Sequence, residues 1–200
     1  MPSQTATKQR IGAAAGIASP ILAFLCILTA LASYPSFSWT NNALSDLSVV
    51  KGATGVLFNF GLYASGLLAF IFAVLGLFTH HEKSWVGQMG AVFYAAATAS
   101  LMGIGVFNES FSGTHYAFSV AFFVLSPISL FILTCAFWLA KQKEMAIFTV
   151  VTGLIAGLPW ILQFAIVYAP NVAIPETISG LAISAWTITL GIRMTKQAEK

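Results

Sequence analysis

Six long apolar runs divide the chain and leave little polar sequence between them. Hydrophobic residues make up 58% of the 200 residues and charged residues only 8%, whereas a soluble domain carries about 25% charge. A soluble fold of this length has too little interior to hide so much apolar surface, so the sequence predicts that lipid is its solvent. A bilayer span needs roughly 20 apolar residues, and the chain is long enough for six spans with short connections.

We expect the six runs to be α-helices, because they are too long and alternate too weakly to be strands of a membrane barrel. The predicted fold class is an all-α integral membrane protein, an antiparallel bundle of six transmembrane helices that forms a single domain over residues 1–200. The first run is longer than the core of a signal peptide, about 7–15 residues, so we interpret it as a retained helix. The predicted spans are residues 11–33, 54–78, 85–107, 116–140, 145–168 and 174–192.

Basic residues indicate which side of the membrane each connection faces. If the ends and connections are numbered from the amino terminus, eight of the nine Lys and Arg residues fall at alternate positions, and only Lys51 falls on the other side. Cytoplasmic loops collect Lys and Arg, so we predict a multi-pass protein of the cell membrane with both termini in the cytoplasm. The net charge of +3 follows from these helix ends, so nucleic acid is not an expected partner. The eight residues are Lys8, Arg10, Lys83, Lys141, Lys143, Arg193, Lys196 and Lys200.

The opposite, outer side collects acids, amides and one histidine. Ionisable and strongly polar groups are costly inside hydrocarbon and mark functional sites there. The strongest of them all fall in the outer half of the predicted bundle, and His80 and His81 fall at the cytoplasmic edge, where we expect them to be solvated. The sequence therefore predicts a polar pocket that opens toward the outer leaflet or the outer aqueous face. Its predicted residues are Asp46, Asn59, Glu109, His115, Gln163 and Glu176.

The leading hypothesis is that this pocket binds the headgroup of an amphipathic membrane lipid. Asp46 and Glu176 would bind a cationic headgroup, and His115 would donate or accept a proton. Asn59 and Gln163 would orient the headgroup through hydrogen bonds, while aromatic-rich helices hold its chains.

Two alternatives belong to other classes of protein. In the first, Asp46, Glu109, His115 and Glu176 hold a divalent metal such as zinc or manganese, and the protein is a membrane-embedded hydrolase or transferase acting on lipids. The interval from Glu109 to His115 is not a recognised metal motif. In the second, the protein is a non-enzymatic scaffold or sensor that meets its partner through small residues spaced four apart. Those pairs are Gly12 with Gly16, and Gly153 with Gly157. The sequence names neither a lipid, a reaction nor an oligomeric state.

Several short motifs resemble those of one uncharacterised family. They are Asn42-Ala43-Leu44-Ser45-Asp46-Leu47, Leu57-Phe58-Asn59, Phe107-Asn108-Glu109 followed by His115, and Pro175-Glu176 with Ser184-Ala185-Trp186. The family is a prokaryotic six-helix membrane family known as a domain of unknown function, number 998. The same order of motifs is similar, more distantly, to the DRAM-like superfamily, some of whose eukaryotic members are linked to GPI-anchor lipid remodelling and to phosphoinositide and asymmetry control. The resemblance implies six helices, a lipid context and an outer polar set, but it supplies no reaction. The residues it places in that set are Asp46, Asn59, Glu109, His115 and Glu176.

Overall fold

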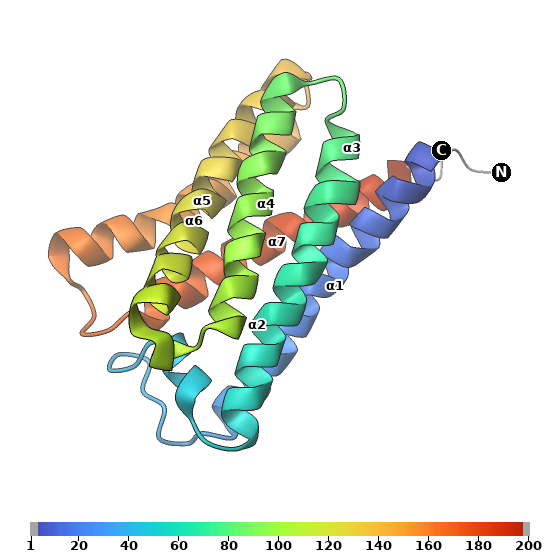
Figure 1. Cartoon of the computed structure of the whole chain (residues 1–200). Helices are drawn as coiled ribbons and strands as arrows, with labels where there is room; N and C mark the ends of the chain where they lie inside the picture. Colours follow the sequence, from blue (N-terminus) through green and yellow to red (C-terminus); the bar gives the residue numbers. More distant parts are fainter. Residues whose placement is uncertain (1–3, 198–200) are drawn as a thin grey trace.

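The computed structural model describes residues 4–197, which form long helices joined by short connections (Figure 1). Lys200, one of the residues used to predict sidedness, lies outside the described residues. No strand occurs in the part of the chain that the structure describes, as the all-α prediction requires. The long helices are α1 (Gln4–Ala32), α2 (Ala53–Ile71), α4 (Trp85–Val106), α5 (Ser112–Leu139), α6 (Lys143–Ile166) and α7 (Ala173–Gln197). The short elements are η1 (Leu44–Val49), η2 (Phe72–Leu77), α3 (Phe78–His80) and η3 (Glu109–Phe111).

Among the described residues, five helical segments are long and apolar enough to cross a membrane. They are Gln4–Ala32, Ala53–His80, Trp85–Val106, Glu109–Leu139 and Lys143–Ile166. The sixth long helix, α7, has 25 residues but is less apolar, because it carries Glu176, Arg193 and Lys196. The membrane character of the chain is thus supported, whereas the sixth span remains a prediction.

The six long helices form a closed ring in which α7 completes the circuit. Each of α1, α2, α4, α5 and α6 packs against the next, and α7 packs against both α6 and α1. Figure 1 shows α7 (red) crossing obliquely behind the other helices, with its last turns beside the first turns of α1. The η1 connection lies at the opposite end of the bundle. The start of α1 and the end of α7 thus share one end of the bundle, while the side of the membrane that this end faces remains a prediction.

Glycines allow the closest approaches between helices. A Cβ on Gly12 of α1 would lie 2.4 Å from the backbone nitrogen of Gly76, and one on Gly16 would lie 2.6 Å from the Phe72 ring. The other predicted pair packs more loosely, since a Cβ on Gly157 would lie 3.6 Å from Pro127. The face of α1 that carries Gly12 and Gly16 is therefore covered by its own chain and is not free to receive a partner.

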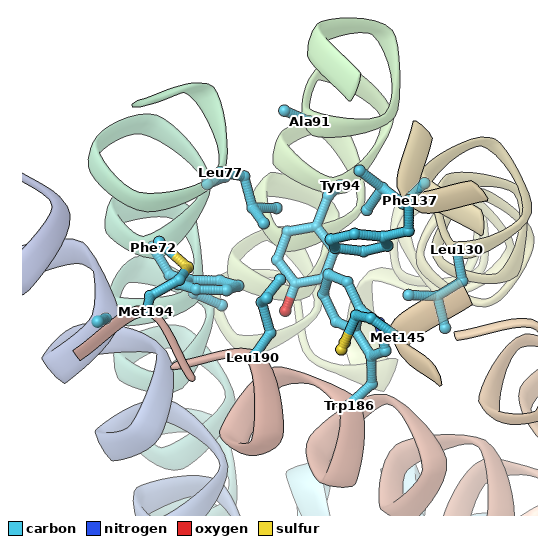
Figure 2. Close-up of a cluster of buried hydrophobic side chains, with 14 of the residues drawn as sticks. Phe72, Leu77, Ala91, Tyr94, Leu130, Phe137, Met145, Trp186, Leu190 and Met194 are labelled. Carbon is cyan, nitrogen blue, oxygen red and sulfur yellow. The ribbon is translucent and has the colours of Figure 1, made fainter. Parts of the chain in front are cut away.

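Aromatic side chains fill one of the two main apolar clusters (Figure 2). Phe72, Tyr94 and Trp186 meet there, with ring centroids 5.8 Å apart for Phe72 and Tyr94 and 5.5 Å apart for Tyr94 and Trp186. Their polar atoms are paired across helices, because the Tyr94 hydroxyl lies 2.6 Å from Oγ1 of Thr187 and the Trp186 indole N–H donates to Oγ1 of Thr149 at 2.9 Å. The cluster takes residues from α1, α2, η2, α4, α5, α6 and α7.

The second span contains a wide turn. α2 continues without interruption into η2, a π-helical segment over Phe72–Leu77, and α3 completes the span. A π-helical turn holds one more residue than an α-helical turn, and such turns occur mostly as short insertions within α-helices. The widened segment includes both Phe72 and Gly76, the two residues that touch the glycines of α1.

The expectation that His80 and His81 are both solvated was wrong for His81. Its side chain is 6% exposed and lies against Phe137, with ring centroids 5.1 Å apart. The glycine at position 87 makes room for it, because a Cβ there would lie 2.4 Å from the His81 ring. Composition alone did not reveal this shielding, which depends on a contact with the following helix.

Candidate functional site

Three connections pack together at the end of the bundle predicted to face outward. They are residues 33–52, 107–111 and 167–172. The backbone N–H groups of Asn171 and Ala173 donate to the carbonyls of Thr40 and Asn42, at 3.0 and 3.1 Å. The Asn171 side chain also donates to the Asn41 carbonyl at 3.1 Å. The first and last of these connections therefore hold each other in place.

Two predicted acids attach η1 to the helices around it. Glu176, in the first turn of α7, accepts the backbone N–H of Leu44 through Oε2 at 2.6 Å. The hydroxyl of Ser45 donates to Oε1 of Glu109 at 2.8 Å, and the Glu109 N–H donates to the Ser48 hydroxyl at 3.2 Å. A carboxylate at a helix N-terminus is favoured by the helix dipole, which explains why an acid is tolerated at the start of α7.

Asp46 accepts hydrogen bonds from residues of its own segment. Its Oδ2 accepts hydrogen bonds from the Asn42 side chain at 2.6 Å and from the Ala43 N–H at 3.1 Å. These bonds close the first turn of η1, as a carboxylate at a helix start commonly does. Part of the Asp46 carboxylate is therefore already occupied by its own backbone.

His115 is the most informative of the predicted residues. It is 5% exposed, and its Nδ1 lies 2.7 Å from the Phe107 carbonyl oxygen. A carbonyl cannot donate, so Nδ1 carries a proton and donates it. The other ring nitrogen, Nε2, is buried and has no hydrogen-bond partner. In the neutral ring this nitrogen is an acceptor without a donor, an uncommon state for a buried polar atom.

A cavity of about 590 Å³ brings four of the six predicted residues together. Its walls come from η1, η3, the outer halves of α5 and α6, and the start of α7. None of the described residues that line it is a lysine or an arginine. The predicted residues in its lining are Asp46, Glu109, His115 and Glu176.

A second, smaller cavity of about 110 Å³ adjoins the first. The two have Ser45, Ser119, Phe123 and Glu176 in common, so these residues lie where the cavities meet. The smaller cavity runs among mostly apolar side chains of α1, α2, α4, α5 and α7 and reaches Tyr94 at its inner part. An outer cavity with acidic and histidine side chains in its wall thus lies next to a more apolar inner one.

Two predicted residues line neither cavity and have backbone partners instead. Asn59 donates to the Ser48 carbonyl at 2.9 Å, while its side-chain oxygen is buried without a partner. Gln163 pairs with both backbone groups of Ala169, donating to the carbonyl at 2.7 Å and accepting the N–H at 3.3 Å. The structure therefore places both side chains behind the cavity wall, where they support the outer connections.

Sequence reasoning left Ser119 out of the predicted pocket. This residue lies one helical turn after His115 on α5 and sits at the junction of the two cavities. The sequence feature that could have indicated Ser119 is its spacing of four residues from His115, which places both side chains on one face of the helix. Serine is so common in these helices that the spacing alone did not single it out.

The four acidic and histidine residues of the outer cavity do not form a built metal site. Within residues 4–197, no group of three or more His, Cys, Asp and Glu side chains is arranged to hold a metal ion. Catalytic zinc takes three protein ligands, so the residues as placed do not fit the metal hypothesis.

The family described as protein of unknown function DUF998 matches residues 17–193 of the chain. The chain belongs to this family. The match covers the whole outer site and confirms the resemblance to domain 998, while the more distant DRAM-like resemblance remains a prediction. No curated protein and no solved structure matches the chain.

Proposed function

We propose that this DUF998 protein binds an amphipathic membrane lipid, with the headgroup in the outer cavity and part of an apolar chain in the inner one. The observation that carries this proposal is that a cavity of about 590 Å³ lined by four acidic and histidine side chains shares wall residues with a more apolar cavity of about 110 Å³. Ligand sites are typically concave and mostly apolar, with a few placed polar groups that fix orientation. A molecule with one polar and one apolar end matches such a pair of cavities.

Exposed apolar side chains around the outer cavity support entry from the lipid. Tyr116 on α5 is 66% exposed and Phe164 on α6 is 75% exposed, and both line the cavity. In Figure 1 the last turns of α6 (orange) lean away from the other helices. In a bilayer these apolar surfaces face acyl chains, so a lipid would enter sideways between α5 and α6.

In this proposal the predicted residues divide into two roles. Asp46, Glu109, His115 and Glu176 contact the headgroup, because all four are among the residues that line the cavity. Asn59 and Gln163 act indirectly, by fixing the backbone of the outer connections through the hydrogen bonds described above. The assignment to the outer leaflet depends on the predicted sidedness of the basic residues.

Native mass spectrometry of the purified protein tests the proposal by counting retained lipid. Alanine at Glu109 or His115 is expected to reduce lipid retention relative to the wild type. Glu144 provides a matched control, since it is an exposed acid in the first turn of α6 and lines neither cavity. Unchanged lipid retention in both cavity variants, with folding verified by thermal unfolding, would overturn the proposal.

The two alternatives have less support. The metal-dependent hydrolase or transferase lacks a three-ligand cluster among the described residues, and elemental analysis of the purified protein measures whether any metal is present. For the scaffold hypothesis, Gly12 and Gly16 already contact their own chain. Stable co-purification with a partner, together with free replacement of the outer polar residues, would favour it.

A further inference from the structure

The charged and titratable groups that line the outer cavity are nearly all hydrogen-bond acceptors. Three carboxyl groups, from Asp46, Glu109 and Glu176, lie in its wall together with the imidazole of His115. A carboxyl group offers acceptor oxygens whether or not it is protonated, and Nε2 of a neutral imidazole whose Nδ1 is the donor is an acceptor only. A ligand that pairs with these groups must therefore supply hydrogen-bond donors.

The unpaired nitrogen of His115 strengthens this requirement. The ring is held in one tautomer by the Phe107 carbonyl, and Nε2 is buried without a partner in a side chain that is 5% exposed. An unsatisfied buried acceptor is unfavourable, so a ligand that donates a hydrogen bond here gains affinity that a ligand without a donor does not. Unlike an acidic cluster at a surface, this is a polar atom already removed from water.

The same lining disfavours phosphate-bearing headgroups. Phosphates in proteins are bound by Arg and Lys through charge-assisted hydrogen bonds. No lysine or arginine occurs among the described residues that line the outer cavity, so none of them would neutralise the charge of a phosphate. A headgroup that fits is neutral or positively charged.

The spread of the acceptors disfavours a small cation as well. They come from four separate elements, η1, η3, α5 and α7, and no three of them are arranged around one ion position within residues 4–197. A headgroup that meets several of them must extend across the cavity and present several donors. Tyr116 and Trp160 add aromatic walls, which can pack against the C–H face of a sugar ring.

Resting on the proposed function, we infer that the outer cavity recognises the uncharged, polyhydroxylated headgroup of a glycolipid. His115 Nε2 accepts one sugar hydroxyl, and Glu109 and Glu176 accept others. This inference names the class of headgroup, which the proposed function leaves open.

Three lipids with identical oleoyl chains test the inference: monoglucosyl diacylglycerol, diacylglycerol and phosphatidic acid. Binding is measured by native mass spectrometry in a detergent without a sugar headgroup, because a maltoside would compete for the cavity. The glucosyl lipid is expected to bind about tenfold more tightly than diacylglycerol, the effect of roughly one hydrogen bond to a buried or charged acceptor. Phosphatidic acid is expected to bind more weakly than the glucosyl lipid.

Variants at His115 connect the preference to one atom. His115→Phe removes the acceptor, so it is expected to abolish the advantage of the glucosyl lipid while diacylglycerol still binds. His115→Gln supplies an amide oxygen and is expected to restore part of the advantage. A preference that survives unchanged in His115→Phe would overturn the inference.

The remaining outcomes separate the inference from the proposed function. Equal binding of all three lipids, or a preference for phosphatidic acid, refutes the sugar preference and leaves lipid binding standing. If none of the three lipids binds, both proposals fail. Methyl glucoside supplies the sugar without chains, and if it binds as tightly as the glucosyl lipid, the ligand is a soluble sugar and both proposals are wrong.

Discussion

Replacing Gln163 with alanine is expected to destabilise the fold without emptying the outer cavity. The side chain pairs with the Ala169 carbonyl at 2.7 Å and with its N–H at 3.3 Å, and Ala169 is 2% exposed. Between them Val167 holds a left-handed conformation with φ of 47°, which is strained for a β-branched residue. The two Gln163 hydrogen bonds therefore hold a strained turn in place after α6.

The magnitude follows from the two backbone groups that the substitution leaves unpaired. Each buried unpaired group costs about 1–3 kcal/mol, so the sum for two is about 2–6 kcal/mol. The bond of 3.3 Å is beyond the usual range for N–H···O and contributes less, which puts the expected loss at about 2–4 kcal/mol. Gln163→Glu keeps the acceptor but loses the donor, so it is expected to lie between the wild type and alanine.

Unfolding in mixed micelles of increasing denaturing detergent measures these differences. Gln142 is a matched control from the other end of α6, because its side-chain oxygen is buried without a partner. Gln142→Ala is expected to change stability by less than about 0.5 kcal/mol, or to raise it. If Gln163→Ala is as stable as Gln142→Ala but loses bound lipid, this reasoning is refuted and the sequence-based assignment of Gln163 to the headgroup is right.

Three further predictions address packing, sidedness and pH. Gly105→Ala would place a Cβ 2.5 Å from a backbone nitrogen of α2, so we expect it to lower the free energy of unfolding by about 1–3 kcal/mol in the same assay. Gly113→Ala is the control, because a Cβ there meets nothing within 4 Å, and we expect it to be neutral or stabilising. A cysteine at Gly113 is expected to react with an impermeant thiol reagent from outside the cell, and one at Lys141 only after permeabilisation; labelling of both from one side would contradict the topology. Burial, and then the neighbouring His80, lower the pKa of His81 from 6.5 to about 4. The unfolded chain therefore binds this proton more readily, and stability should fall by about 3 kcal/mol as the pH drops from 6.5 to 4, a slope that should be absent in His81→Asn.

Hydropathy located the helices well but not their ends. α2 and α4 begin within one residue of the predicted positions 54 and 85. α1 instead begins at Gln4, ahead of the predicted residue 11, and α7 ends at Gln197, beyond the predicted residue 192. Hydropathy marks only the apolar part of a helix. Where a helix continues beyond that part, its polar residues give no hydropathy signal, so the predicted helix is too short.

Charged residues of the site could be predicted from the sequence, whereas the shape of the cavities and the hydrogen-bond partners of the amides could not. Glu109, His115 and Glu176 were found because they are rare ionisable groups on one side of the bundle, and they do line one cavity. Gln163 is also a strongly polar residue on that side of the bundle, but its partner is a backbone group six residues further along the chain. The sequence does not reveal that pairing. The inner cavity had no signal at all, because a void among Leu, Ile and Phe side chains has the same composition as a filled core.

The wide turn over Phe72–Leu77 also affects how changes in length would be tolerated. An ordinary α-helix advances by about 100° per residue, so removing one residue rotates everything beyond it onto a different face. At the π-helical segment, a deletion can instead convert the wide turn into a regular one, and the rest of the span keeps its neighbours. A deletion of one residue is therefore expected to disturb the helix contacts less in this stretch than in the regular turns of the same span.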